Sequence, residues 1–259
     1  MIYVGTSGYS YDDWIGGFYD KGIRRSDMLQ EYAQRFGFVE IDSTYYSMPN
    51  PLMFLNMARK TPDGFKFAVK LHASMTHSRD CDPDAYREFK SALSPLTESK
   101  KLGCVVAQFP YSFHMNDANI VYIKRLHAYL EPLPLSVEFR NDGWMDARVY
   151  SFLSDEGIGF VCVDEPKLDG LVKPEIIVTS NIGYLRFHGR NAGKWYNHKR
   201  AYERYNYFYD EGTLKEWVPG IEFINDNTDA AFVAFNNHFR GQGAVNASML
   251  KRLLDEASY

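Results

Sequence analysis

Short runs of apolar and β-branched residues alternate with longer amphipathic stretches along the chain. The runs predict eight strands, at residues 2–7, 38–44, 66–72, 104–109, 135–140, 159–164, 183–188 and 231–236. Helix start signals stand between them: Asn50 and Asp82 each precede a proline, and Asn116 precedes an amphipathic stretch. Strand and helix therefore alternate, and eight such units of roughly 30 residues fill one (β/α)8 barrel. We expect a single α/β domain over residues 1–259, with a TIM-barrel-like fold and parallel strands.

The lengths of the connections exclude the simplest alternative to a barrel. An antiparallel sheet with one solvated face would give a similar alternation of apolar and polar positions. Hairpins need only a few residues, whereas the connections here run to about 20 residues or more and carry helix caps. Parallel strands joined by crossover helices are therefore favoured.

Alternate side chains of a strand point to opposite faces, and sorting the strands in this way separates two sets of residues. The apolar set, expected to lie against the helices, is Ile2, Val4, Val39, Ile41, Phe67, Val69, Val105, Ala107, Val137, Phe139, Val161, Val163, Leu185, Phe187, Val233 and Phe235. The polar set, expected to point into the barrel, is Ser7, Glu40, Asp42, Thr44, Lys70, His72, Gln108, Glu138, Arg140, Asp164, Arg186, His188 and Asn236. Catalytic groups of (β/α)8 enzymes cluster at the carboxyl ends of the strands. We therefore expect Glu138, Arg186, His188, Lys70 and Asn236 to converge at that mouth.

Several stretches resemble the motifs of the YecE-like family, also called domain of unknown function 72. They are GTSGYSYDDW, VEIDSTYY, TPDGFKFAVK, AQFP, VEFRNDGW, YLRFHGR, RYNYFYD and FNNHFRGQGAVNA, in that order. The resemblance covers nearly the whole chain, and it implies a TIM-barrel-like fold without a settled activity. The family positions that fall on this sequence are Ser7, Gly8, Trp14, Glu40, Thr44, Tyr45, Lys70, Gln108, Glu138, Arg140, Trp144, Asp164, Arg186, His188, Gly189, Asn236, Asn237 and Asn246. One departure is Tyr9, which stands where many relatives carry tryptophan and keeps an aromatic ring there.

Opposite charges nearly cancel within the polar set. It holds Lys70, Arg140 and Arg186 against Glu40, Asp42, Glu138 and Asp164. Buried charges must be paired, so ion pairs without a catalytic role are one interpretation of these residues. Charged pairs in a concave site are also where pKa values are displaced for acid–base chemistry. On the second interpretation, the candidate catalytic residues are Glu138, His188, Lys70, Arg140, Glu40 and Asp164.

Two glycine-rich loops follow the last two predicted strands and contain basic but no acidic residues. Their sequences are HGRNAGKWYNHKR and NNHFRGQGAVNAS, and their cations are Arg190, Lys194, Lys199, Arg200 and Arg240. In (β/α)8 enzymes these loops often bind phosphate, because glycines let backbone N–H groups approach the anion. We therefore expect a small anionic or phosphate-bearing ligand held by Arg186 and Arg190, with His188 between them. Two solvated basic loops are the simpler alternative.

Aromatic residues near the same rim are suited to stacking on a base or a sugar ring. They are Tyr9, Trp14, Tyr45, Tyr46, Trp144 and Trp195, and packing would account for most of them equally well. The candidate ligand-binding set is Ser7, Trp14, Thr44, Tyr45, His72, Gln108, Trp144, Arg186, Arg190, Asn236 and Asn237. The net charge of −4 disfavours binding along duplex DNA, whereas local contact with single-stranded nucleic acid stays open.

No cofactor is indicated by a local motif. A divalent metal would need convergence of His72, His188, Glu40, Glu138 and Asp164, and without an HExxH motif we expect no tightly bound metal. The P-loop and the G-x-S-x-G elbow are also absent, which disfavours NTPases and serine hydrolases.

Three cysteines without a CxxC spacing fit reduced thiols. The start of the chain lacks a basic-then-apolar leader and no apolar run is long enough to cross a bilayer, so we expect a cytoplasmic protein without membrane contact.

Three functions remain open from the sequence. The first is an enzyme, most simply a hydrolase, that acts on a phosphodiester, nucleotide or sugar phosphate. The second is a glycosidase with paired carboxylates such as Glu40 and Glu138. The third is a non-catalytic protein that binds a ligand or nucleic acid in the same pocket.

Overall fold

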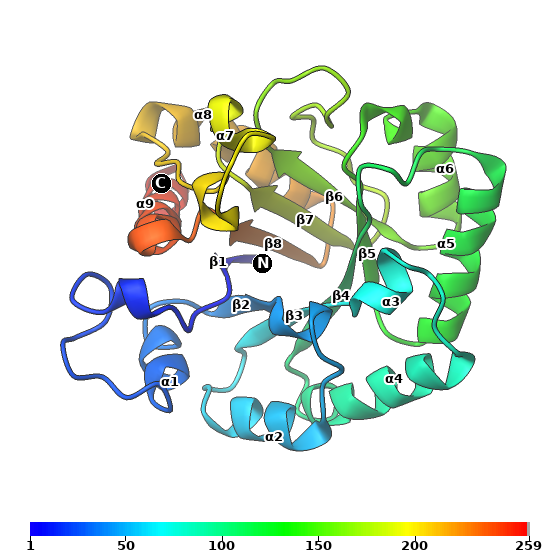
Figure 1. The fold of residues 1–259 in the computed structure, drawn as a ribbon. Coiled ribbons are helices and arrows are strands. Elements are labelled where there is room, and N and C mark those ends of the chain that lie inside the picture. The colour runs from blue at the N-terminus through cyan, green and yellow to red at the C-terminus, as the bar shows by residue number, and fades with distance from the viewer. Residues whose placement is uncertain (258–259) are drawn as a thin grey trace.

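The computed structural model, which describes residues 1–257, is a barrel of eight parallel strands that pair in chain order and close between the first and the last (Figure 1). The strands are β1 (Ile2–Ser7), β2 (Phe38–Ile41), β3 (Lys66–Lys70), β4 (Leu102–Gln108), β5 (Leu135–Glu138), β6 (Gly159–Asp164), β7 (Ile182–Phe187) and β8 (Ala230–Phe235). This arrangement confirms the predicted (β/α)8 fold class.

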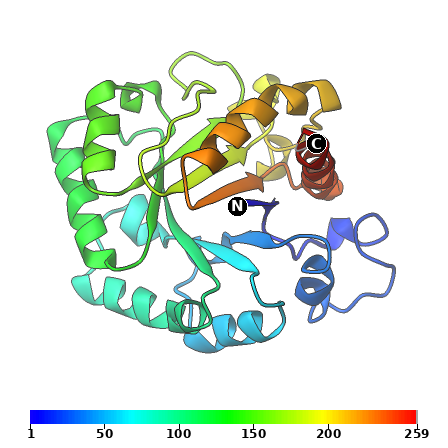
Figure 2. The same ribbon diagram turned by 180° about the vertical axis from the view of Figure 1, so that it is seen from behind.

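Helices connect the strands and surround the barrel, as the view from behind in Figure 2 also shows. The α-helices are α1 (Met28–Tyr32), α2 (Pro51–Arg59), α3 (Ala73–Thr76), α4 (Pro83–Glu98), α5 (Asp117–Leu130), α6 (Ala147–Asp155), α7 (Ala192–Trp195), α8 (Glu211–Asp226) and α9 (Gln242–Ala257). Short 3-10 helices are η1 (Asp12–Trp14), η2 (Ser43–Tyr45), η3 (Asp142–Trp144), η4 (Ala201–Glu203) and η5 (Phe239–Gly241). The predicted caps are present: the side chains of Asn50, Asp82 and Asn116 accept hydrogen bonds from the first turns of α2, α4 and α5.

The register of the strands shows which side chains point into the barrel, because paired residues of parallel strands face the same side. Glu40 pairs with Ser7, and Gln108 pairs with Glu138. The predicted inward direction is confirmed for Ser7, Glu40, Lys70, Gln108, Glu138 and Arg186. A layer of aromatic rings lies below these polar groups, where Phe38, Tyr184 and Phe232 contact one another.

The side chains of strand β6 point to the opposite faces from those predicted. Val163 pairs with the inward-pointing Arg186, whereas Asp164 pairs with Phe187, which points to the helices. Val161 and Val163 therefore face the interior, and the prediction that Asp164 does so is wrong. The sequence GFVCVD is apolar on both faces until its last residue, so the alternation could not show which of its side chains face the interior.

Three strands are shorter than predicted, because β2, β3 and β5 end at Ile41, Lys70 and Glu138. Asp42, His72 and Arg140 thus lie in the loops that follow the strands, and Thr44 lies in η2. Side-chain hydrogen bonds of Thr44 and His72 are consistent with β2 and β3 ending before these residues. The Thr44 hydroxyl donates to the Lys70 carbonyl at 2.6 Å, and the His72 ring caps α3 by accepting from Ser74.

Within the part of the chain that the structure describes, no helix is long and apolar enough to cross a membrane.

Candidate active site at the barrel mouth

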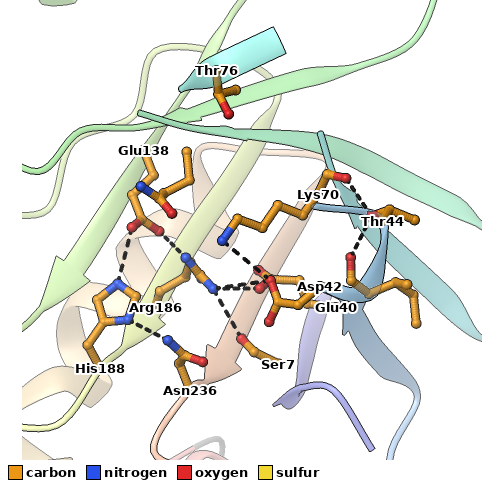
Figure 3. Close-up of polar contacts among 12 residues, drawn as sticks. Ser7, Glu40, Asp42, Thr44, Lys70, Thr76, Glu138, Arg186, His188 and Asn236 are labelled. Atoms are coloured by element: carbon orange, nitrogen blue, oxygen red, sulfur yellow. Dashed lines mark hydrogen bonds and ion pairs between the residues drawn. The ribbon is translucent and has the colours of Figure 1, made fainter. Parts of the chain in front are cut away.

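Arg186 is the centre of a charge network buried inside the barrel (Figure 3). Its Nη1 contacts Glu138, and its Nη2 lies 2.6 Å from Oε1 of Glu40. All three side chains are at most 1% exposed. Burial by itself lowers the pKa of Arg186, but the two carboxylates raise that pKa well above its usual value. The guanidinium is therefore charged at every physiological pH.

Glu40 and Glu138 share this guanidinium but differ in acidity. Burial raises the pKa of Glu40 to about 7, although Arg186 opposes the shift. Burial also acts to raise the pKa of Glu138, but Arg140 and Arg186 outweigh it and hold the pKa well below its usual value. Glu138 is thus ionised at neutral pH, whereas Glu40 exchanges a proton near neutrality.

His188 is a neutral neighbour of Glu138. Its Nε2 lies 3.4 Å from Oε1 of Glu138, and its Nδ1 lies 3.1 Å from the amide nitrogen of Asn236 (Figure 3). Because the amide nitrogen donates, Nδ1 accepts and the ring proton stands on Nε2, facing the carboxylate. Burial, assisted by Arg140, lowers the pKa of His188 to about 3. The imidazole is therefore uncharged and orients Glu138.

Arg140 connects the buried network to the mouth of the barrel. Its Nη2 lies 2.7 Å from Oε1 of Glu138, and its Nη1 lies 3.2 Å from Oε2 of Glu165. Burial raises the pKa of Glu165 to about 7, although Arg140 opposes the shift. Nearby, Nζ of Lys70 lies 3.8 Å from Oδ1 of Asp42. The network thus holds two carboxyl groups, Glu40 and Glu165, that titrate near neutral pH.

Glu165 was not predicted from the sequence. It follows β6 directly, and its side chain is fully buried. The signal that would have found it is its position, since the first residues after a barrel strand lie at the mouth.

A cavity of about 270 Å³ opens above Arg140. The residues that line it are His77, Gln108, Pro110, Tyr111, Arg140, Leu171, Trp195, Tyr196, Arg204 and Tyr205, which come from the loops after β3 to β7 and from the end of β4. None of them is acidic. The Gln108 amide donates to the Phe109 carbonyl at 2.7 Å, which leaves its oxygen as an acceptor for a ligand. Ligands of (β/α)8 enzymes bind at this end of the barrel, so the cavity is the candidate binding site.

Three cations affect His77, one of the residues that line this cavity. Burial and the charges of Lys70, Arg140 and Arg79 lower the pKa of His77 to about 4. Arg204 adds a further cation: its Nε donates to the Trp195 carbonyl at 2.9 Å, and its guanidinium lies 5.2 Å above the Trp195 ring. Within residues 1–257, no carboxylate forms an ion pair with Arg204. The cavity is therefore suited to an anion.

Arg190 does not reach the mouth. Gly189 adopts φ +88°, as a sharp turn requires, but the turn directs Arg190 to Asp164 on the outer side of the barrel wall. Nε of Arg190 donates to Oδ1 of Asp164 at 2.9 Å, and Asp164 also accepts from the Tyr209 hydroxyl at 2.7 Å and from the Trp217 indole at 3.0 Å. The predicted clamp of Arg186 and Arg190 with His188 between them is therefore wrong. Arg186 is buried and already paired, and Arg190 lies outside.

The two predicted tryptophans are structural. Trp14 and Trp144 are fully buried, and their indole nitrogens donate to the carbonyls of His238 at 2.7 Å and Phe113 at 2.6 Å. The ring of Trp144 also stacks on Phe139, with 4.1 Å between the ring centroids. Neither ring is accessible to a ligand at the mouth.

Of the remaining predicted residues, some lie at the barrel mouth and others make structural hydrogen bonds away from the cavity. Thr44 and His72 make the local hydrogen bonds given above, and the amide of Asn237 donates to the Tyr207 carbonyl at 2.8 Å and to the Asn246 side chain at 2.9 Å. Ser7 lies under Arg186, 3.4 Å from Nη2, and so belongs to the network rather than to the cavity. The half-buried ring of Tyr45 lies at the mouth with Nζ of Lys70 4.8 Å from its centroid.

Metal-ligating side chains do not gather in the structure. Across residues 1–257, no group of three or more His, Cys, Asp or Glu side chains is arranged to hold a metal ion. All three cysteines, Cys81, Cys104 and Cys162, are free thiols.

Two known bacterial proteins share sequence with the chain, one over almost its full length and one over about half of it. The UPF0759 protein YunF of Bacillus subtilis is 32% identical over 272 residues, which cover 98% of this chain and 95% of that protein. The UPF0759 protein YecE of Escherichia coli is 32% identical over 137 residues, 52% of this chain and 45% of that protein. Similarity of sequence thus extends to proteins from distant bacteria.

Solved structures agree with this relationship. The crystal structure of a DUF72 family protein (TM1631) from Thermotoga maritima superimposes with a TM-score of 0.91 at 39% identity, covering 98% of this chain and 99% of that one. A DUF72 family protein (EF0366) from Enterococcus faecalis gives a TM-score of 0.88 at 26% identity, covering 98% and 96%. The family described as "Protein of unknown function DUF72" matches residues 3–258. The chain therefore belongs to the DUF72 family, as the sequence motifs predicted.

Proposed function

We propose that the protein is an enzyme that binds a small phosphate ester in the mouth cavity and hydrolyses it. The observation that supports this most strongly is a cavity lined by two arginines, one of which, Arg140, also contacts Glu165, a carboxyl group with a pKa of about 7. Arg140 and Arg204 both line the cavity. Guanidinium groups hold phosphate through parallel hydrogen bonds, so Arg204, which has no carboxylate partner within residues 1–257, is the proposed main contact. Arg140, which also contacts Glu138 and Glu165, adds positive charge beside it.

Glu165 is the proposed proton donor and acceptor. Its Oε2 lies 3.2 Å from Nη1 of Arg140. A group whose pKa lies near the working pH transfers protons most efficiently, and Glu165 meets that condition. A phosphate that binds Arg140 also weakens the hold of Arg140 on the Glu165 carboxylate. Binding therefore favours the protonated form that a leaving group requires.

The proposed reaction uses only water, the ester and this carboxyl group. Water forms a bond to phosphorus while the ester P–O bond breaks, and protonated Glu165 gives its proton to the leaving oxygen. The proton released by the water returns to Glu165. Glu138 and His188 contribute by fixing Arg140 from below, as positioning residues.

The buried network favours this reaction over glycoside hydrolysis. The Arg186 guanidinium contacts both Glu40 and Glu138 and so occupies the space where a glycosidic oxygen would have to lie. The paired carboxylates are therefore better suited to holding the site than to reacting with a sugar.

The test is phosphate release from a panel that contains an aryl phosphate, nucleotides, sugar phosphates and a phosphodiester. We expect turnover by the wild type, a fall in kcat of about 100-fold or more in Glu165→Gln, and a rise in KM of about 10-fold in Arg204→Gln. Arg87→Gln is the matched control, because Arg87 is 71% exposed on α4. Binding of these esters without turnover would contradict the catalytic part of the proposal, and absence of binding would contradict all of it.

A further inference from the structure

Exposed tyrosine rings gather at the mouth cavity. Tyr196 is 61% exposed and Tyr111 is 45% exposed, and both line the cavity together with the half-buried Tyr205 and the buried Trp195. A large aromatic ring contributes most to stability when it is buried, so rings left open to solvent side by side mark a surface that binds something. The aromatic lining is therefore a feature of the cavity that anion binding does not explain.

One of the two exposed rings lies against the backbone of another loop, and the other follows a buried ring in the sequence. The hydroxyl of Tyr111 lies against Gly170, where a Cβ atom would approach it to 2.5 Å, so glycine is needed for the ring to lie there. Tyr196 follows Trp195, whose buried ring carries the Arg204 guanidinium at 5.2 Å. The same short segment thus presents an aromatic ring and one of the two anion-binding cations.

The other lining groups disfavour a sugar as the organic part of the ligand. Sugar hydroxyls need donors and acceptors in pairs, and carboxylates usually supply the acceptors. No acidic residue lines the cavity, and Gln108 offers a single amide. The volume of about 270 Å³ lies at the small end for ligand pockets, so it fits one ring and one phosphate.

We infer that the phosphate ester bound at Arg140 and Arg204 has a flat aromatic ring as its organic part, as in an aryl phosphate, and that Tyr196 and Tyr111 stack on that ring. The inference rests on the proposed function, because it takes the anion site as given. The inference adds the class of substrate to the proposed function. Stacking on the faces of the aromatic ring increases the affinity, whereas the phosphate group orients the substrate in the cavity.

A matched pair of probes tests the ring separately from the anion. Phenylphosphonate and methylphosphonate carry the same anionic group, neither has an ester bond to hydrolyse, and only the first has a ring. Calorimetric titration into the wild type should show phenylphosphonate binding about 10 times or more tightly than methylphosphonate. Tyr196→Ala should lower that ratio, because only Tyr111 then stacks on the ring, while leaving the affinity for methylphosphonate unchanged, and Tyr196→Phe should retain the ratio. Phe223→Ala, which removes a 54% exposed ring on α8, should change neither affinity.

The outcomes separate the two proposals. If both phosphonates bind with equal affinity, or if Tyr196→Ala keeps the ratio, the aromatic inference is wrong and the anion site stands. If neither phosphonate binds, or if Arg204→Gln leaves both affinities unchanged, the anion site itself is wrong and the proposed function fails with it.

Discussion

Replacing Arg186 with methionine perturbs the buried network at its centre. The side chain is 1% exposed, and methionine would leave the carboxyl groups of Glu40 and Glu138 without their shared partner. Removing one partner of a buried ion pair costs about 3–5 kcal/mol. We expect Arg186→Met to lower the free energy of unfolding by that amount at neutral pH, measured by urea denaturation followed by circular dichroism. Arg87→Met is the control, because the 71% exposed Arg87 should change stability by less than about 0.5 kcal/mol.

The loss in Arg186→Met should depend on pH in a defined direction. Without the guanidinium, burial keeps the folded-state pKa of Glu40 above that of the unfolded chain, with no cation to oppose it as Arg186 does, whereas Arg140 still contacts Glu138. A raised carboxyl pKa favours folding at low pH and loses that contribution as pH rises through the folded value. The variant should therefore approach wild-type stability as the pH falls from about 8 to about 5, and adding Glu40→Gln should recover part of the loss. A loss below about 1 kcal/mol, or one that does not change with pH, would refute the description of Arg186 as a buried, paired charge.

Two further predictions concern Arg190 and His188. Arg190→Ala should lower the free energy of unfolding by about 1–3 kcal/mol, because Asp164 keeps its bonds from Tyr209 and Trp217 but loses its cation; chemical denaturation that matches the wild type would contradict this. The folded pKa of His188, about 3, lies below its unfolded value, so its contribution is complete above about pH 6.5 and is lost as pH falls toward 3. His188→Gln should therefore lose stability less steeply on acidification, by up to about 1.4 kcal/mol per pH unit, and identical slopes would show that the ring is not buried as a neutral group.

The fold could be predicted because strand and helix signals repeat with little ambiguity. Connections of about 20 residues exclude hairpins, and capping residues such as Asn50, Asp82 and Asn116 mark helix starts locally. For most strands, the side chains that point into the barrel could be predicted because one face of the strand is apolar and the other is polar. Strand β6 failed this rule because both of its faces are apolar, so only its register with β7 determines that Asp164 points outward.

The site was harder to predict, because a charge in the sequence does not show its partner. Arg186, Glu40 and Glu138 converge as expected, but their mutual pairing and complete burial depend on three strands that are distant in sequence. Arg190 seemed free because its loop has no acidic residue, whereas its partner Asp164 lies on another strand. Arg204 begins the RYNYFYD stretch, but the stretch did not indicate its role, which follows from packing on Trp195 at the cavity.

Crystals soaked in tungstate would locate the anion site directly, because tungstate resembles phosphate and its tungsten atom scatters anomalously. We predict an anomalous peak in the mouth cavity, with tungstate oxygens within hydrogen-bond distance of the guanidinium groups of Arg140 and Arg204. Bound tungstate found only on the outer basic loops, or no peak at the mouth of a crystal in which the cavity is open to solvent, would contradict the anion site on which the proposed hydrolysis depends.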